Sequence, residues 1–458
     1  MHCGLFSQTI LTGNHLMHPE SHLDTKKIEN LTIHNFQNLI DYVRTHSAFY
    51  RRTLPKNCPV TSLKSISGIP FTKKEDLASF SSEFLCVPAE KITEISTTSG
   101  STGKPLIVKM TEHDIQRLGK SEFLCFTGAG VLASDTFLLA VTLDKCFIAG
   151  LAYYLGLREI GAGIVRVGPT QPEMLLKMAI ETGATGMVGV PSYFIRVMEY
   201  ALQSGFPVNE LLINKLVMIG EPIRNADLTL NNIGKRLFEL WPNCGLYSTF
   251  GMTELQGAFC ECTAMCGNHI HPEQFYVEIL DDNGNVLPPE TPGELTVTTF
   301  GIEGMPLIRY RTGDVTYLIN KPCACGLLTP RIGPIVGRKS QKLKIKGTTL
   351  YPGAILNAMD EMDFILDYAV IITGNLDLSD EVEIRYCLNK NSIARTSSPA
   401  VPLNPEEEKR HLNIITEKLK SNLKITPRCI PDTAEAIDAL KSSVSHRKKT
   451  RIIDRRKK

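Results

Sequence analysis

The order of apolar and polar positions predicts alternating helices and strands over much of the chain. The segment 172–184 has apolar residues at helical spacing, the apolar run 186–190 follows at once, and 192–205 returns to helical spacing before a terminal glycine. A second apolar run of strand type covers 215–220. Short strands that alternate with amphipathic helices are typical of a mainly parallel sheet covered by helices. We therefore predict a large α/β domain, which one helix over 26–52 precedes.

The pattern changes towards the C-terminus. Residues 276–300 carry β-branched strand patterns around the turn DDNGN, which predicts a hairpin. Beyond residue 343, two strand patterns, a polar helix and a final short strand predict a small, separate α+β domain. We place the join near GRKSQ, which divides the chain into domains of 1–337 and 338–458.

Composition narrows the class of protein. The formal net charge is +2 with neutral histidines, so no strong overall charge favours nucleic acid or an acidic membrane surface. The N-terminal segment lacks the basic start and continuous apolar core of a signal peptide, and the most apolar stretch, 137–157, is interrupted by Asp144 and Lys145. We expect a soluble, cytoplasmic protein that binds neither nucleic acid nor membrane. Its 13 cysteines are then expected to be mostly reduced thiols.

A segment rich in glycine and hydroxyl side chains, TTSGSTGKP at 97–105, is the strongest local signal of chemistry. Gly100 and Gly103 allow backbone amides to approach an anion, and Lys104 adds a positive charge. A Walker A loop needs a different glycine spacing and a hydroxyl residue after the lysine, which disfavours a kinase or P-loop ATPase. A flexible turn is the alternative. The predicted phosphate cradle comprises Thr98, Ser99, Gly100, Ser101, Thr102, Gly103 and Lys104.

Later segments supply further groups that a nucleotide and its metal need. The segment 220–222 follows a predicted strand, where its backbone could line a base pocket. Phe250 offers an aromatic face to adenine, and the carboxylate of Glu254 suits Mg²⁺. Asp314 is suited to ribose hydroxyls, and Arg338 supplies a rigid donor near the domain join. The predicted nucleotide contacts are Gly220, Glu221, Pro222, Phe250, Gly251, Asp314 and Arg338.

Taken in order, these segments resemble those of the acyl-adenylate-forming ligases, and the likeness is strongest to the phenylacetate-CoA ligase branch. The resemblance covers nearly the whole chain. It implies a large adenylate-forming domain with a β-rich subdomain and a small, mobile C-terminal lid domain. The matching segments are HSAFYRRTLP at 46, PFTKKEDL at 70, TTSGSTGKP, VPSYF at 190, GEP, YSTFGMTE, GELTVTT, MPLIRYRTGD, LKIKGTTLYP at 343, and KKTRIID near the end.

The resemblance implies a two-step reaction that uses ATP, Mg²⁺ and coenzyme A. The carboxylate of a small acid, aryl or related, attacks the α-phosphate and releases pyrophosphate, and a thiol then displaces AMP. By position the adenylation lysine is Lys448, with Lys449 as the alternative, while a solvated basic tail is the other interpretation. The resemblance also assigns Thr253 and Glu254 to the catalytic group, and Lys346 and Gly347 to nucleotide binding.

Two departures from the branch leave alternatives open. Phe250 stands where the branch usually has tyrosine, and Ser340 and Gln341 replace acidic residues at the hinge. Because the small domain is understood to rotate about this hinge between the two steps, an enzyme that only adenylates is one alternative. Delivery to an acyl or aryl carrier protein, a non-catalytic relic of the fold, and a homodimeric assembly are others.

Cysteines and histidines cluster after the GMTE motif and again in the run PCACG. A CxC pair that is joined by one Cys and one His from another loop could complete a tetrahedral zinc site. Some members of the resembled branch carry a similar pattern, and reduced cysteines in a loop are the other interpretation. By position, a structural Zn²⁺ is bound by Cys262, His269, Cys323 and Cys325, with Cys266 as a substitute ligand.

Aromatic and small side chains in two segments are candidates for the acyl pocket. Phe147 and Tyr153 lie in the first segment, and Ser192 and Tyr193 lie at a strand-to-helix turn in the second. Such side chains could form a flat slot for an aryl acid. Burial in the core is the other interpretation, because helical faces bury aromatic residues in any case.

Overall fold

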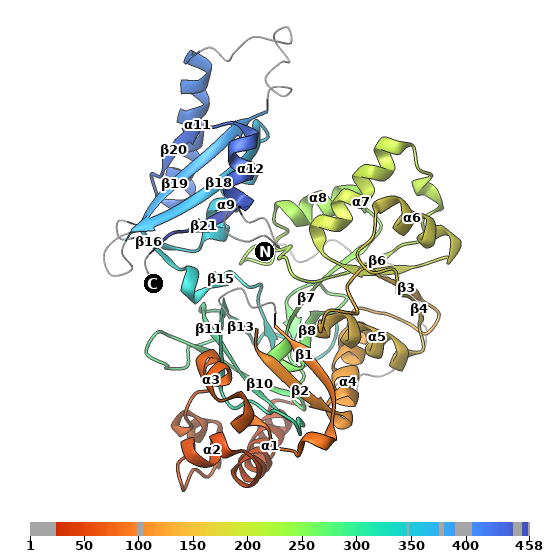
Figure 1. Cartoon of the computed structure of the whole chain (residues 1–458), viewed down its shortest axis with the longest axis vertical. Coiled ribbons are helices and arrows are strands. Elements are labelled where there is room, and N and C mark those ends of the chain that lie inside the picture. Colours follow the sequence, from red (N-terminus) through yellow and green to blue (C-terminus); the bar gives the residue numbers. More distant parts are fainter. Residues whose placement is uncertain are drawn as a thin grey trace.

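The chain folds into a large and a small domain (Figure 1). A computed structural model describes residues 24–98, 105–345, 348–374, 380–389, 405–442 and 451–456. The predicted fold class is confirmed, because a large α/β domain with a β-rich part carries a small α+β domain at its C-terminal end. Within those ranges, none of the helices combines the length and apolar character that crossing a membrane requires.

A nine-stranded sheet forms the centre of the large domain. Its strands are β3 (Thr136–Leu139), β4 (Gly163–Val165), β5 (Gly186–Gly189), β6 (Lys215–Met218), β7 (Gly245–Met252), β8 (Gly257–Glu261), β9 (Asn268–His269), β13 (Leu318–Ile319) and β14 (Arg331–Ile332). Their order is β13-β14-β9-β8-β7-β6-β5-β3-β4. Neighbours pair in parallel from β7 to β4 and antiparallel from β7 to β13.

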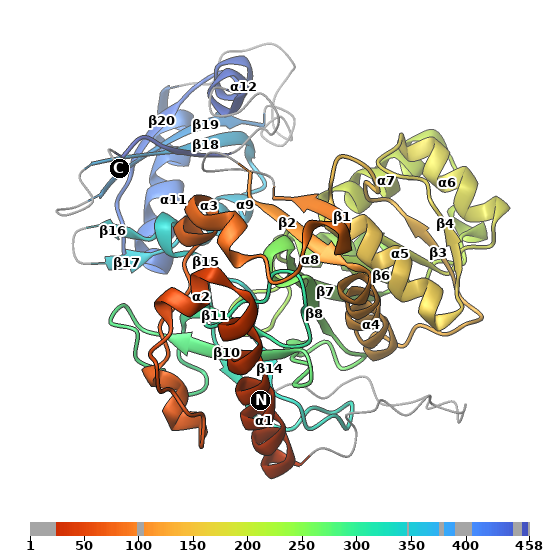
Figure 2. The same ribbon diagram turned by 60° about the horizontal axis from the view of Figure 1, so that its bottom comes forward.

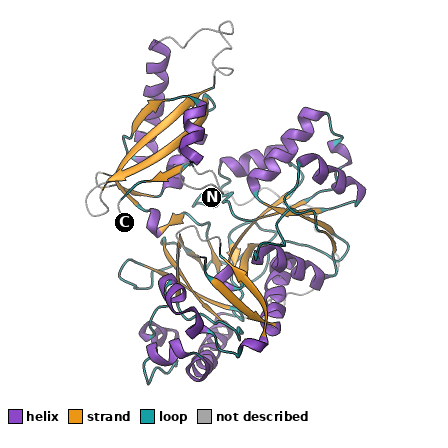
Figure 3. Ribbon diagram, viewed as in Figure 1, coloured by secondary structure: helices purple, strands orange, loops and turns teal. Residues whose placement is uncertain are grey.

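Helices cover both faces of the parallel part of this sheet (Figure 3). They are α4 (Glu112–Gly128), α5 (Ile148–Ile160), α6 (Pro172–Glu181), α7 (Pro191–Ser204) and α8 (Asn232–Leu240). Leu138 and Met187 belong to the core that α6, α7 and α8 close, whereas Phe137 and Val188 belong to the core that α4 and α5 close. Because these strands are buried on both faces, they form continuous apolar runs in the sequence.

A second sheet and an N-terminal group of helices complete the large domain. The sheet is antiparallel and contains β10 (Phe275–Leu280), β11 (Gly293–Thr299), β12 (Tyr310–Thr316) and β15 (Gly337–Arg338), so the hairpin predicted over 276–300 is confirmed. The helices α1 (Thr25–His46), α2 (Ala48–Thr53) and α3 (Lys74–Phe84) lie beside this sheet (Figure 2). The ring of Phe36 in α1 meets the rings of Tyr276 and Phe300 edge on, at centroid distances of 5.3 and 5.2 Å.

The single helix predicted over 26–52 is wrong at one residue. Ser47 has an extended backbone, so α1 ends there and α2 begins. Its Oγ accepts the backbone N–H of Tyr50 at 3.3 Å and donates to the carbonyl of Glu83 at 2.8 Å. A serine in this N-cap role satisfies a free donor of the second helix, which makes the break favourable.

The small domain is built on a four-stranded sheet in the order β20-β19-β18-β21. Its elements are β16 (Leu343–Ile345), β17 (Thr348–Leu350), α9 (Pro352–Asp360), β18 (Ile365–Gly374), β19 (Asp380–Leu388), α11 (Pro405–Leu423), β20 (Arg428–Pro431), α12 (Ala434–Ser442) and β21 (Ile452–Asp454). The apolar core of this domain begins at Leu343. Arg338 still pairs with Asp314 of the large domain, so the boundary predicted between 337 and 338 falls inside β15.

Arg117 anchors helix α4 to the β-rich part of the large domain. Its Nε donates to the carbonyl of Phe300 at 2.6 Å. Its Nη1 and Nη2 donate to the carbonyls of Gln256 and Gln274 at 2.8 and 2.9 Å. Burial lowers the pKa of this guanidinium to about 10, which leaves it protonated at neutral pH. One buried side chain therefore satisfies backbone acceptors from three separate segments.

We expect Arg117→Met to lower the free energy of unfolding by about 3 kcal/mol or more, because it leaves three buried carbonyls without their donor at about 1–3 kcal/mol each. Urea unfolding followed by circular dichroism measures the change. Lys120→Met, on the outer side of the same helix, is the matched control and should change stability by less than about 0.5 kcal/mol. Equal losses in the two variants would contradict the anchoring role.

Candidate active site

A β-hairpin carries the predicted phosphate cradle at its tip. The hairpin consists of β1 (Ile92–Thr97) and β2 (Ile107–Thr111), which pair antiparallel. Thr98 lies just beyond β1, and its Oγ1 accepts the backbone N–H of Leu106 at 3.0 Å. The structure therefore fixes where the cradle begins and ends. The other predicted cradle residues, Ser99, Gly100, Ser101, Thr102, Gly103 and Lys104, lie outside the described residues.

A cavity of about 680 Å³ between the two domains collects the remaining predicted nucleotide contacts that the structure describes. It lies beyond the carboxyl ends of β6 and β7, where ligands bind in open parallel sheets. The small domain closes it with Pro352, Gly353 and Leu356 from the start of α9. Lys346 and Gly347 are outside the described residues. The predicted residues that line the cavity are Gly220, Glu221, Pro222, Phe250, Gly251, Asp314 and Arg338.

Asp314 and Arg338 form an ion pair at the edge of this cavity. They are register partners of β12 and β15, and the Nε of Arg338 donates to Oδ1 of Asp314 at 3.0 Å. Burial raises the pKa of Asp314, and the nearby guanidinium of Arg338 opposes that shift. The second carboxylate oxygen of such a pair is suited to accept hydrogen bonds from ribose hydroxyls.

Thr253 and Glu254 occupy a short 3-10 turn (Thr253–Leu255) directly after β7. Glu254 is 4% exposed, and the phenol of Tyr310 donates to its Oε1 at 3.3 Å. Glu254 also lines a small cavity together with Leu106, the residue at which the hairpin leaves the cradle. The carboxylate thus lies near the ends of the cradle. A residue that holds a phosphate-bound Mg²⁺ must lie there.

A smaller cavity of about 70 Å³ adjoins the nucleotide cavity. The two share Ile219, Gly251 and Met252 in their linings, and the smaller one adds the predicted acyl-pocket residues Phe147 and Tyr153. The carboxylate of an acid must lie next to the α-phosphate to attack it, and this smaller cavity lies next to the nucleotide cavity. We therefore refer to it as the acyl cavity.

The structure places Ser192 and Tyr193 outside both cavity linings. The backbone N–H and the hydroxyl of Ser192 both donate to the carboxylate of Glu221, at 2.9 Å each. The phenol of Tyr193 donates to the carbonyl of Thr170 at 3.0 Å. Their described contacts give Ser192 a role in positioning Glu221 and give Tyr193 a role in packing α7.

Glu122 is a residue of the acyl cavity that the sequence analysis missed. It projects from α4, is 3% exposed, and its Oε2 has no hydrogen-bond partner among the described residues. Burial raises the pKa of its carboxyl to about 8. The available signal was an acidic residue on the apolar face of a helix, four positions after Leu118 and three before Cys125.

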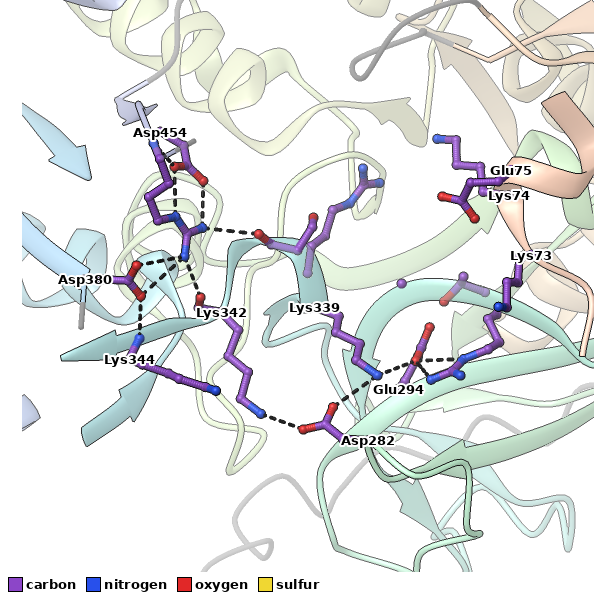
Figure 4. Close-up of a pocket in the computed structure, with 16 residues that line it drawn as sticks. Lys73, Lys74, Glu75, Asp282, Glu294, Lys339, Lys342, Lys344, Asp380 and Asp454 are labelled. Carbon is purple, nitrogen blue, oxygen red and sulfur yellow. Dashed lines mark hydrogen bonds and ion pairs between the residues drawn. The ribbon is translucent and has the colours of Figure 1, made fainter. Parts of the chain in front are cut away.

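A second interdomain cavity, of about 750 Å³, surrounds the hinge (Figure 4). Lys339 pairs with Asp282 and Glu294 of the large domain at 3.1 Å each. On the other side, Arg456 pairs with Asp380 at 3.3 Å. Lysines and arginines outnumber carboxylates in its lining, which consists of Lys73, Lys74, Glu75, Asp282, Glu294, Arg311, Thr312, Gly313, Arg338, Lys339, Ser340, Lys342, Lys344, Asp380, Asp454 and Arg456.

Four predicted metal ligands converge at the far end of the nine-stranded sheet. The ligand atoms of Cys262, His269, Cys323 and Cys325 all lie within 4.8 Å of one another. The Sγ atoms of Cys262 and Cys323 are 3.5 Å apart, and Cys325 Sγ lies 3.5 Å from His269 Nε2. The structure thus selects this set over Cys266, which donates to the carbonyl of Ala264.

The raised pKa of Glu122 predicts how stability depends on pH. Between the ordinary carboxyl pKa of 4.5 and the folded value of about 8, the folded protein retains a proton that the unfolded chain has released. The free energy of unfolding therefore falls as pH rises through this window. Glu122→Gln cannot titrate, so its stability relative to the wild type should increase across the window, by up to about 1.4 kcal/mol per pH unit. Urea unfolding of both proteins measures the two slopes, and equal slopes would contradict the prediction.

The chain matches the family model described as "AMP-binding enzyme" over residues 50–303, more than half of its length. It is 28% identical over 425 residues to phenylacetate-coenzyme A ligase of Thermus thermophilus, covering 88% of this chain and 92% of that protein. It is 25% identical over 380 residues to the enzyme of the same name from Escherichia coli, covering 82% and 84%.

Solved structures agree with this match. The structure of 2-hydroxyisobutyryl-CoA ligase in the postadenylation state, in complex with 2-HIB-AMP, has a TM-score of 0.79 to this chain at 19% sequence identity, and each chain covers 93% of the other. This likeness establishes the fold. On the match to the family model, the chain belongs to the AMP-binding enzyme family and is an acyl-adenylate-forming ligase similar to phenylacetate-CoA ligases.

Proposed function

We propose that this protein uses ATP to convert a carboxylic acid to an acyl-adenylate, releases pyrophosphate, and then transfers the acyl group to the thiol of coenzyme A. One observation carries the proposal. A cavity lined by the nucleotide motifs lies between the two domains and adjoins the acyl cavity at Gly251 and Met252. An acid in the smaller cavity and ATP in the larger one are thereby held for in-line attack on the α-phosphate.

The residues around the two cavities divide the work of the first step. Asp314 and Arg338 bind the ribose, and Phe250 presents its ring to the adenine. Glu254 would hold Mg²⁺, which neutralises charge on the phosphates when bound. The cradle at 98–104 retains the leaving pyrophosphate through backbone amides and Lys104. Lys448 lies outside the described residues, and the resemblance implies that it neutralises the attacking carboxylate and the α-phosphate.

The second step requires the small domain to move and admit coenzyme A. The basic cavity at the hinge (Figure 4) offers Lys73 and Lys74 on the large domain to an anionic ligand. Ser340 and Gln341 replace the acidic hinge residues of the resembled branch, yet neighbouring Lys339 and Lys342 keep the hinge in ion pairs with the large domain. A carrier protein as acceptor and a homodimeric assembly stay predictions from the sequence.

We expect Lys448→Ala to abolish pyrophosphate release from ATP while ATP affinity stays within a few-fold of the wild type, because the lysine acts on the charge that develops in the transition state. The assay measures pyrophosphate over a panel of acids, with and without coenzyme A, and thioester formation in parallel. Release that depends on one acid supports adenylation, and thioester that forms only with coenzyme A supports the second step.

The matched control is Lys449→Ala, one position along the same basic segment. It should retain most of the wild-type rate. A fully active Lys448→Ala protein would remove Lys448 from the mechanism. An inactive Lys449→Ala protein beside an active Lys448→Ala protein would move the role to Lys449.

We also propose that Cys262, His269, Cys323 and Cys325 bind a structural Zn²⁺. Zinc–sulfur bonds of about 2.3 Å in a tetrahedral site separate two sulfur atoms by about 3.8 Å. The 3.5 Å between the Sγ atoms of Cys262 and Cys323 is close to that value. The other ring nitrogen of His269, Nδ1, lies 2.8 Å from the hydroxyl of Thr329, the kind of contact that orients a ligating imidazole. None of the four side chains lines either cavity of the proposed reaction, which supports a structural role.

We expect Cys323→Ser to lose bound zinc and to lower the free energy of unfolding by more than about 2 kcal/mol, because the loss of a structural metal belongs to the changes with large effects. Elemental analysis of the purified protein gives the metal content, and thermal unfolding gives the stability. Cys266→Ser is the control, since Cys266 lies nearby but outside the four-ligand group. Wild-type protein without zinc would contradict the proposal.

A further inference from the structure

The acyl cavity contains one carboxyl group, that of Glu122, and its other polar side chains are the hydroxyls of Tyr153 and Thr253. Most of the surrounding side chains are Leu, Ile, Ala, Phe and Met. The Oε2 of Glu122 is buried and has no hydrogen-bond partner in the described part of the chain. An unpartnered buried polar group destabilises a fold, so its presence in a ligand cavity calls for a functional reason.

The neighbouring polar side chains are committed to other partners. The hydroxyl of Thr249 donates to the carbonyl of Met218 at 3.0 Å. Since a hydroxyl has one proton, the phenol of Tyr153 must donate in its own 3.1 Å contact with Thr249. The Oγ of Ser121 accepts the backbone N–H of Ala258 at 3.2 Å. Thr253, the other hydroxyl of the lining, is only half-buried, so Glu122 is the buried polar group of the cavity whose Oε2 has no partner among the described residues.

Close packing fixes the position of Glu122. Gly156 of α5 faces it, and a Cβ at that glycine would lie 2.4 Å from the Cβ of Glu122. On β8, a Cβ at Gly257 would lie 2.7 Å from the Oγ of Ser121. Only glycine permits α4 to approach both neighbours so closely. The carboxyl therefore belongs to a rigid wall of the cavity.

The size of the acyl cavity restricts the acid. A cavity of about 150 Å³ holds a benzene molecule. The acyl cavity has about 70 Å³, which is less than half of that. This volume suits a chain of a few carbon atoms, and a larger acid would have to extend towards the adjoining nucleotide cavity. The size of this space favours a short acid over the aryl acid that the sequence analysis expected.

We propose that the acid this enzyme activates is short and carries a hydrogen-bond donor, a hydroxyl or an amino group, which binds the carboxyl of Glu122. The inference rests on the proposed function and names its substrate class. Glu122 is the specificity-determining residue, because a substrate that supplies the missing partner removes the cost of the buried carboxyl, whereas an unsubstituted acid leaves it unpaired.

The pKa of Glu122, raised to about 8, is consistent with this assignment. At neutral pH the carboxyl is mainly protonated and can both accept from and donate to an uncharged hydroxyl. An ammonium group would instead draw the proton off and pair with the carboxylate. The two classes of substrate share the same contact, and a direct comparison of acids separates them.

The test measures pyrophosphate release with propanoate, its 2-hydroxy, 3-hydroxy, 2-amino and 3-amino derivatives, benzoate and phenylacetate. We expect at least one derivative to exceed propanoate about 100-fold or more in kcat/KM, and both aryl acids to be poor substrates. A preference for a hydroxy acid identifies an alcohol as the partner, and a preference for an amino acid identifies an ammonium group. A preferred aryl acid would overturn the inference and leave the proposed function intact. If none of the acids caused pyrophosphate release, both would be overturned.

Variants of Glu122 give the decisive comparison. Glu122→Met, which keeps length and removes the carboxyl, should reduce the preference over propanoate to less than about tenfold. Glu122→Gln keeps a donor and an acceptor and should retain much of the preference for a hydroxy acid. Glu159→Met, on the exposed face of α5, is the matched control and should preserve the wild-type ratio. Unchanged ratios in both Glu122 variants would overturn the inference, and the Gln variant decides alone if the Met variant does not fold.

Discussion

The hydrogen bonds of Arg117 hold the site together, because they fix α4 against the segments that carry the chemistry. One of its acceptors is the carbonyl of Gln256, which closes the turn that carries Glu254. The same helix carries Glu122 at the wall of the acyl cavity. A single rigid element therefore sets the distance between the metal-binding carboxylate and the group that selects the acid. Functional groups on such elements are held more accurately than groups on loops.

Much of the fold could be predicted because strands that are buried on both faces form continuous apolar runs in the sequence. The apolar runs at 186–190 and 215–220 form β5 and β6 in the centre of the parallel sheet. The antiparallel extension through β9 and β14 forms no such runs, since each strand has two residues and pairs with a segment far along the chain. The break at Ser47 was missed for a related reason. Apolar spacing continues across it, and only the contact with Glu83 shows that the chain turns there.

The site was predictable where a motif follows a strand, because the strand ends of a parallel sheet meet at one edge. That geometry brought 220–222 and Phe250 to one cavity. Ser192 also follows a strand, but its hydroxyl binds the carboxylate of Glu221 and does not itself line a cavity, a contact that the sequence pattern cannot predict. Glu122 was missed because a glutamate on a helix is ordinarily exposed. Its burial depends on the approach of α5 at Gly156, a contact between helices that only the structure shows.

The hinge is bound to the two domains by ion pairs of unequal burial. Between the domains, Lys342 pairs with Asp282, whose side chain is 66% exposed, so this contact contributes about 1 kcal/mol or less and weakens with salt. On the small domain, Arg456 and Asp380 are almost fully buried, and Arg456 also donates to the carbonyl of Ser340. Separating that pair would leave a buried charge without its partner, which is costly. A rotation of the small domain about the hinge would therefore separate Lys342 from Asp282 at low cost and leave the buried pair of Arg456 and Asp380 intact.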